Sequence, residues 1–98
     1  MPQFLIIATD FDGVISQRLA IRPSHLLRMK TEKVKGHFLL GGARLNASGE
    51  MYGSMLVIDL PDERAANDWL LADPYYTGKV WESWTITPFR LVDDAALS

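Results

Sequence analysis

Hydrophobic and polar positions follow different patterns along the chain, and these patterns predict six regular elements. The first apolar run is short and ends at a turn containing Gly13, which is typical of a buried strand. A second apolar stretch ends at a pair of glycines, and a third is apolar on both faces of its pleat. The predicted strands are 4–9, 37–40, 51–60 and 79–92, and the predicted helices are 16–35 and a second that opens at Pro61 and ends before Pro74.

The first predicted helix contains Pro23, which lacks a backbone donor and clashes with the preceding turn. We expect either that Pro23 opens the main helix after a shorter turn, or that it kinks one longer helix. Gly36 is expected to end the helix, because glycine readily takes the left-handed conformation found there. In both arrangements we expect the core to receive an apolar stripe made of Leu26, Leu27 and Val34.

The remaining segments contain residues that usually begin and end elements. Residues 43–50 are rich in Asn, Ser and Gly and are predicted to form a loop. Pro61 is expected at the first position of the second helix, and Asp62 and Glu63 then favour the positive end of that helix. Pro88 predicts a bulge or an edge position in the last strand. The inward stripe of the second helix is predicted to be Ala65, Ala66, Trp69 and Leu70.

The order of elements predicts an α+β, ferredoxin-like βαββαβ fold, with a four-stranded antiparallel sheet and two helices on one face. We expect one domain over residues 1–98, of which 93–98 form a frayed tail. Two helices cover one face only, yet the strands at 4–9 and 51–60 are apolar on both. We therefore expect a homodimer that buries the second face; a monomer with an exposed apolar face is the less favoured alternative, since such patches are uncommon.

Composition narrows the classes of protein. The chain has 98 residues, of which 48% are hydrophobic and 22% charged, as in an ordinary globular domain. Its net charge of −2 argues against nucleic acid as a partner, because a basic surface is missing. Cysteine is absent, and no apolar run reaches the roughly 20 residues of a membrane span, so we expect a cytoplasmic protein without a membrane partner. The two histidines lie far apart on different elements, so we expect no metal site.

A cationic stripe is the first candidate for chemistry. Residues three and four apart share a helix face, so Arg18, Arg22, His25 and Met29 are expected to form one stripe. Two guanidinium groups beside a titratable imidazole are suited to an anionic or enolisable small molecule. This pattern does not identify the substrate.

The segment over 6–14 resembles the first motif of haloacid-dehalogenase-type phosphatases, in which one Asp is the nucleophile and a second Asp two residues on is the acid or base. Asp10 and Asp12 take those positions, and Asp93 with Asp94 resembles the acidic metal-binding pair of that family. Two predicted strands joined by a loop do not fit its parallel sheet, however, and the other motifs of the family have no counterpart. A turn, in which Asp and Gly are favoured, explains the segment better, and the phosphatase is a remote alternative.

Five short segments resemble the YciI-like (YCII-related) family in order and spacing, from Met1 to about Val92. They are Arg18-Leu19-Ala20-Ile21-Arg22-Pro23-Ser24-His25-Leu26, Gly41-Gly42, Gly53-Ser54, Ala72-Asp73-Pro74-Tyr75 and Ile86-Thr87-Pro88-Phe89.

The resemblance implies a ferredoxin-like fold of the dimeric α/β-barrel superfamily, with a His and an Asp suspected to act as a catalytic dyad. Those two residues correspond to His25 and Asp73. One branch of the family dehydrochlorinates a chlorinated hydroquinone without a metal or organic cofactor, so we expect no cofactor here. Ala43 replaces a proline common in the family, and the 43–50 loop is short. Both departures alter the expected pocket rim, so the substrate of other family members cannot be assigned to this chain.

The chemistry expected of these residues is acid/base catalysis. A carboxylate on one imidazole nitrogen fixes the tautomer and leaves the other nitrogen as a general base or acid. Arg18 and Arg22 are expected to hold a substrate oxyanion, Tyr75 to donate a hydrogen bond, and Asp10 to be a second acid or base near the same rim. We expect a lyase or isomerase acting on a ring-bearing or enolisable molecule. The alternative is a non-catalytic metabolite-binding or accessory dimer.

Each candidate also has a purely structural interpretation. His25 and Asp73 then simply occupy a helix turn and a helix-ending turn, and the arginine stems cover apolar surface. His37 is predicted to be structural. The three tryptophans are predicted to pack in the core or a dimer interface, with a stacking site for a ring as a minor alternative: Trp69, Trp81 and Trp84.

Overall fold

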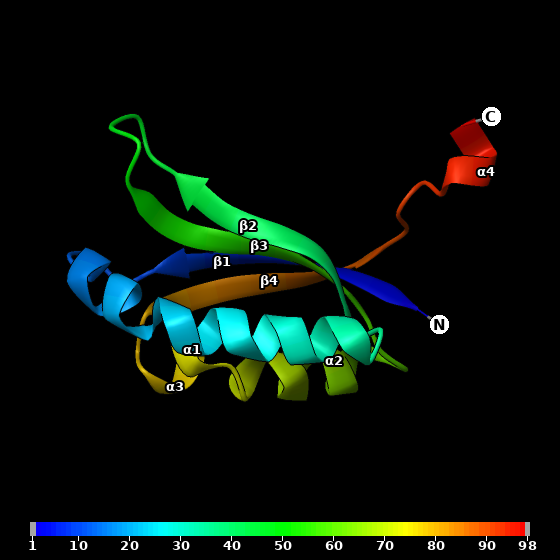
Figure 1. Cartoon of the computed structure of the whole chain (residues 1–98), viewed down its shortest axis with the longest axis horizontal. Helices are drawn as coiled ribbons and strands as arrows, with labels where there is room; N and C mark the ends of the chain where they lie inside the picture. The colour runs from blue at the N-terminus through cyan, green and yellow to red at the C-terminus, as the bar shows by residue number, and fades with distance from the viewer. Residues whose placement is uncertain (1, 98) are drawn as a thin grey trace.

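The computed structural model describes residues 2–97 as one sheet with helices against it (Figure 1). Every pair of neighbouring strands is antiparallel. The strands are β1 (Gln3–Asp10), β2 (Phe38–Leu45), β3 (Met51–Asp59) and β4 (Trp81–Phe89), and the helices are α1 (Ile15–Val34), α2 (Glu63–Leu71), α3 (Pro74–Thr77) and α4 (Asp94–Leu97).

The strand order β2-β3-β1-β4 is that of the predicted ferredoxin-like fold. β1 lies centrally, with β3 on one side and β4 on the other. An antiparallel sheet of this order contradicts the phosphatase alternative, which needs parallel strands. Pro88 lies on β4, which is an edge strand, and this position tolerates a residue without a backbone donor.

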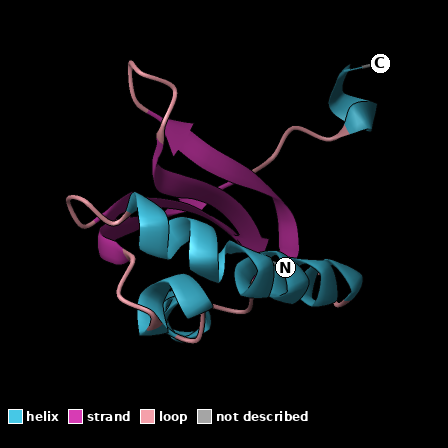
Figure 2. Cartoon of the chain, turned by 60° about the vertical axis from the view of Figure 1, so that its left-hand side comes forward, coloured by secondary structure: helices cyan, strands magenta, loops and turns pink. Residues whose placement is uncertain are grey.

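Buried hydrophobic residues form one cluster in the layer between the sheet and the helices. Figure 2 shows these helices along one side of the sheet. Alternate residues of β1 point into this layer, and β3 faces them in register, with Phe4 opposite Ile58 and Ile6 opposite Leu56. From α2, Ala66, Trp69 and Leu70 close the layer as predicted, whereas Ala65 is only partly buried.

The second face of the sheet carries the other set of alternating residues. Leu5, Ile7 and Met55 point to this face and are partly buried, while Leu40 is 41% exposed. Figures 1 and 2 show α1, α2 and α3 on the opposite side. Within the described residues, this apolar face therefore has no helix covering it.

α1 differs from the expected helix in which side it buries. It is one long helix with Pro23 inside, and Figure 1 shows its first turns running at an angle to the rest. The prediction that an apolar stripe of α1 is buried in the core is wrong, because Leu26, Leu27 and Val34 are 45%, 67% and 87% exposed. The buried residues are Arg18, His25, Met29 and Glu32. The polar stripe faces inward because other elements supply partners for it, as described below.

β2 is longer than predicted. Residues 43–45, expected to belong to a loop, extend the ladder until Leu45 pairs with Met51. The connecting turn is compact because the Asn46 side chain accepts hydrogen bonds from the backbone of Ser48 (2.9 Å) and Glu50 (3.0 Å). The turn signals in this segment therefore apply only to its second half.

Two helix starts also differ from expectation. Asp62 is the N-cap of α2 and accepts a hydrogen bond from the backbone of Ala65, so Pro61 lies before the helix. α2 ends at Leu71, before Pro74 as expected. It is followed by α3, a helical turn that was not predicted from the sequence.

α1 and α3 approach closely at Gly78, where an added Cβ would overlap Ile21.

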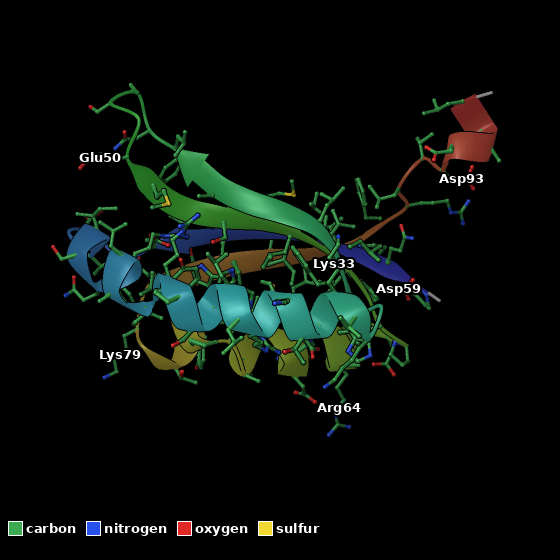
Figure 3. All side chains as sticks on the ribbon, viewed as in Figure 1. Lys33, Glu50, Asp59, Arg64, Lys79 and Asp93 are labelled. Carbon is green, nitrogen blue, oxygen red and sulfur yellow. The ribbon has the colours of Figure 1, made fainter. Side chains whose placement is uncertain are left out.

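The C-terminal segment leaves the body of the molecule after β4. β4 ends at Phe89, earlier than the predicted limit. Within the segment 93–98, for which fraying remains a prediction, residues 94–97 form the short helix α4, and residue 98 lies outside the described residues. Figure 3 shows Asp93 on this segment, away from the helices that cover the sheet.

Candidate active site

Asp73 lies in the junction between α2 and α3 and is fully buried. It is the N-cap of α3, where its Oδ1 accepts a hydrogen bond from the backbone N–H of Tyr75 at 2.9 Å. Pro74 follows at the first helical position, which suits its fixed φ and missing donor. Asp73 was predicted to end the second helix, but it begins the next one.

His25 reaches Asp73 from the middle of α1. Its Nδ1 lies 2.9 Å from Oδ1 and 3.0 Å from Oδ2 of Asp73. A carboxylate only accepts hydrogen bonds, so Nδ1 carries the hydrogen and Nε2 is the basic nitrogen of the neutral ring. Within the described residues, Nε2 has no hydrogen-bond partner. The spacing in the sequence could not show this pair, because 48 residues separate its members.

Arg28 is a second partner of Asp73. Its Nη1 donates to Asp73 Oδ2 at 3.0 Å, and its Nη2 donates to the backbone oxygen of Trp69 at 2.7 Å. The guanidinium lies over the Trp69 ring, 4.3 Å from its centroid. Arg28 therefore holds Oδ2 of the carboxylate, whereas Tyr75 N–H holds Oδ1, and the contact of Arg28 was not predicted from the sequence.

Aromatic rings enclose the imidazole. Tyr75 stacks on His25 with ring centroids 4.2 Å apart, and Trp81 meets the same ring edge-on at 6.1 Å. Burial raises the pKa of the Tyr75 hydroxyl, against the opposing charges of Arg18 and Arg22. Tyr75 therefore keeps its proton and acts as a hydrogen-bond donor.

Arg18 is almost fully buried and connects three elements. Its Nε donates to Asp10 Oδ2 at 2.7 Å, and its Nη2 donates to Ser54 Oγ at 2.6 Å. Its guanidinium also lies over the Tyr75 ring at 4.4 Å. The Asp10 carboxylate compensates the charge of Arg18, since a buried unpaired cation would be strongly destabilising.

A pocket of about 240 Å³ opens between α1 and the β2–β3 half of the sheet. Drug-sized ligands usually occupy about 300–1,000 Å³, so this pocket suits a smaller molecule. Arg22, the exposed member of the cationic stripe, lines it and makes no ion pair within residues 2–97. The polar side chains that line it are Arg18, Arg22, His25, Ser54 and Tyr75, and the apolar ones include Leu26, Met29, Phe38 and Leu56.

The sequence-predicted residues do not all reach this pocket. Asp73 lies directly behind His25, while Asp10 and Asp12 line a separate pocket of about 260 Å³ at the end of β1. The position of Ser54 could have been noticed, since it alternates with Leu56 and Ile58 on the face that β3 presents to the helices. Arg28 lies three residues after His25, a spacing that places the two on neighbouring parts of one helix surface.

The remaining histidine and the tryptophans combine hydrogen bonds with packing in the core. His37 Nδ1 bonds Glu32 Oε1 at 3.0 Å, and Trp69 Nε1 donates to the same oxygen at 2.6 Å. Trp69 and Trp81 are buried in the core, and Trp84 packs against it.

Residues 2–97 contain no cluster of three or more His, Cys, Asp or Glu side chains arranged to hold a metal ion. No helix in this part of the chain is long and apolar enough to cross a membrane.

The sheet order and the helices on one face define a ferredoxin-like protein similar to those of dimeric α/β-barrel type. The chain belongs to the YCII-related domain family, whose model matches residues 2–90. An uncharacterised protein of Haemophilus influenzae is 28% identical over 95 residues, covering 91% of this chain and 97% of its own length. Protein YciI of Escherichia coli O6:H1 is also 28% identical, with the same coverage.

Two solved structures support the fold assignment. The 5-chloro-2-hydroxyhydroquinone dehydrochlorinase TftG of Burkholderia phenoliruptrix AC1100, in complex with 2,5-dihydroxybenzoquinone, superposes with a TM-score of 0.81 at 20% identity, covering 90% of this chain and 93% of its own. An antibiotic biosynthesis monooxygenase gives a TM-score of 0.55 at 15% identity, covering 95% of this chain and 100% of its own. At these identities, the likeness shows the fold alone.

Proposed function

We propose that this protein is an enzyme that performs acid/base chemistry on a small ring-bearing or enolisable molecule, as a lyase or isomerase, without a cofactor. The observation that carries the proposal is the buried His25–Asp73 pair at a pocket of suitable size. Asp73 fixes the tautomer, and Nε2 of His25 then faces a bound molecule as the base.

The reaction begins when Nε2 removes a proton from carbon next to a carbonyl group. The electron pair left on carbon is delocalised onto the carbonyl oxygen, and Arg22 stabilises the resulting enolate together with the Tyr75 hydroxyl. In an isomerase, the imidazolium returns the proton to a different carbon. In a dehydrochlorinase, the enolate expels chloride from the neighbouring carbon, so that the molecule loses one proton and one chloride ion.

The fold neighbour supports a ring-bearing substrate. TftG has the same fold over nearly the whole chain, and its structure contains a six-membered ring compound with oxygen substituents. A pocket with apolar walls and a few polar groups is compatible with such a ligand. The part of the pocket border formed by Gly41, Gly42 and Ala43 belongs to β2, which extends beyond the strand predicted for this chain over 37–40.

We also propose that the protein is a homodimer whose subunits pack through the uncovered face of the sheet. Leu5, Ile7 and Met55 form an apolar surface there, on strands whose other face is already buried against helices. A second copy of the same surface would bury these side chains and leave the pocket on the helix side accessible.

The test replaces His25 by Ala and uses His37→Ala as the matched control. Candidate chlorinated hydroquinones and enolisable lactones are screened for chloride release and for changes in their ultraviolet spectra. We expect turnover by wild type and His37→Ala, and a loss of about 100-fold or more in His25→Ala, the usual scale of a general base. Full activity in a folded His25→Ala variant would exclude the mechanism. Recovery of a tightly bound compound unchanged after long incubation would instead favour a binding protein.

A further inference from the structure

Ser54 occupies an unusual place among the groups that line the pocket. It lies on β3 with its side chain toward the helices and is 3% exposed. Its neighbours on this face of β3, Leu56 and Ile58, are apolar core residues. A hydroxyl buried in such a layer must satisfy its hydrogen-bonding capacity locally, because water cannot reach most of its surface.

Two donors approach the Ser54 oxygen. Arg18 Nη2 donates to it at 2.6 Å, and the indole Nε1 of Trp81 donates to it at 3.2 Å. Neither group can reverse its role, since a guanidinium and an indole N–H are donors only. A serine oxygen accepts two hydrogen bonds through its two lone pairs. Both acceptor positions of Ser54 are therefore occupied before any ligand enters.

The hydrogen of the Ser54 hydroxyl still requires an acceptor. It makes no hydrogen bond to an acceptor within residues 2–97, and Ser54 lines the same pocket as His25 and Tyr75. The hydroxyl can only donate, and the pocket is where an acceptor for it can be placed. The positive charge of Arg18 on the same oxygen makes that hydrogen a stronger donor, because hydrogen bonds to charged groups polarise the hydroxyl.

We infer that Ser54 is a specificity-determining residue that selects ligands with a hydrogen-bond acceptor, above all a carbonyl oxygen or an oxyanion, at this position of the pocket. The inference rests on the proposed function for the pocket and specifies the substrate class. A ligand carrying an ammonium or an amide NH₂ group at the same point would bring a donor against a donor and leave two polar groups unpaired. Sites built in this way discriminate strongly between such analogues.

The arrangement also assigns a part to two residues that support Ser54. Arg18 and Trp81 are positioning residues, because they fix the direction of the hydroxyl from β3. Asp10 in turn holds the Arg18 guanidinium, through Nε at 2.7 Å. Ser54 and His25 line the same pocket, so a ligand oxygen held by Ser54 is bound in the pocket that contains the basic Nε2 of His25.

The binding test uses 2,5-dihydroxybenzoquinone as the probe, in an NMR titration of the full chain. We expect Ser54→Ala to weaken binding about ten- to hundredfold, the scale of a hydrogen bond to a charged acceptor. Ser83→Ala, on β4 and outside the pocket lining, is the matched control and should bind like wild type. Unchanged affinity in Ser54→Ala would overturn the inference. If that variant does not fold, Ser54→Cys keeps a small side chain with only a weak donor and should show the same direction of change.

A second measurement is independent of any ligand. Neutron diffraction from deuterated wild-type crystals locates the Ser54 deuteron, which should point into the pocket; a deuteron directed at a protein acceptor would overturn the inference. Failure of the probe to bind wild type would count against the ring-binding function, and the deuteron would still decide the role of Ser54. Loss of binding in Ser54→Ala combined with full turnover in His25→Ala would support Ser54 and exclude the catalytic proposal.

Discussion

Asp73 combines a structural and a candidate functional role in one carboxylate. As N-cap it accepts from the backbone of Tyr75, and the same side chain receives His25 Nδ1 and Arg28 Nη1. The turn-forming and dyad interpretations of Asp73 are therefore compatible. Four hydrogen-bond contacts from three residues hold this carboxylate, which restricts the orientation of the imidazole.

Asp73→Asn separates the two roles. Asn is as good an N-cap as Asp, so α3 should persist and the protein should fold. The amide can present either its oxygen or its NH₂ group to His25, so the imidazole should lose its single tautomer, and turnover should fall about 100-fold or more. Nitrogen-15 NMR of the imidazole reports the tautomer directly.

The matched control for this prediction is Asp62→Asn, the same change at the N-cap of α2. It should leave the His25 tautomer and turnover unchanged. An unaltered Nδ1–H signal in Asp73→Asn would mean that Asp73 serves only as the cap of α3.

At the scale of elements, α1 shows what a sequence pattern can and cannot predict about a helix. The spacing of four and three residues correctly predicted that Arg18, His25 and Met29 share a face. Hydrophobicity failed to show which face is buried, because the partners that make burial of Arg18 and His25 favourable come from β1, β3 and the α2–α3 junction. Those partners are 8, 36 and 48 residues away. Arg28 was missed for the same reason, since its partners Trp69 and Asp73 lie 41 and 45 residues away, in α2 and just after it.

The inward face of α1 also carries Glu32. Burial would raise the pKa of Glu32, but hydrogen bonds from His37, Trp69 and Lys35, with the charge of Lys35, lower it to about 2 from 4.5. A lowered pKa adds stability above pH 4.5, and this stability is lost as the pH falls through the folded-state value. The shift corresponds to about 3 kcal/mol.

Glu32→Gln should therefore unfold in less urea than wild type at pH 6, and the difference should shrink steadily toward pH 2. Urea unfolding at several pH values measures this directly. Glu82→Gln, on the exposed side of β4, is the control and should follow the wild-type curve. A stability difference that stays constant between pH 6 and pH 2 would contradict the role of the Glu32 charge.

At the scale of the whole molecule, the fold was largely predictable because it depends on element order and on strands with two apolar faces. The family motifs and the element order agreed, and the structure has the predicted strand arrangement. The limits of β2 and the helical turns α3 and α4 were not predictable from patterns, since backbone pairing and capping contacts set them.

Assembly is tested on the uncovered face of the sheet. Ile7→Asp places a charge at the centre of that face, where a dimer would desolvate it, and should convert the protein from dimer to monomer in light scattering. Leu27→Asp, on the outer side of α1 and 67% exposed in the single chain, makes the same chemical change elsewhere and should remain dimeric. A monomeric wild type would show that the face is covered in another way or not at all.

The close approach of α1 and α3 has a consequence for how proteins of this kind diverge. Ile21 occupies the space that a side chain at Gly78 would need. Ile21 lies four residues before His25, and Gly78 lies five residues after Asp73. A pair of substitutions that exchanges bulk between these two positions would tilt α3 against α1 and lengthen the His–Asp contact, with both of those residues intact. Enzymes could thus drift into binding proteins, and back, through changes that an inspection of their catalytic residues alone would not reveal.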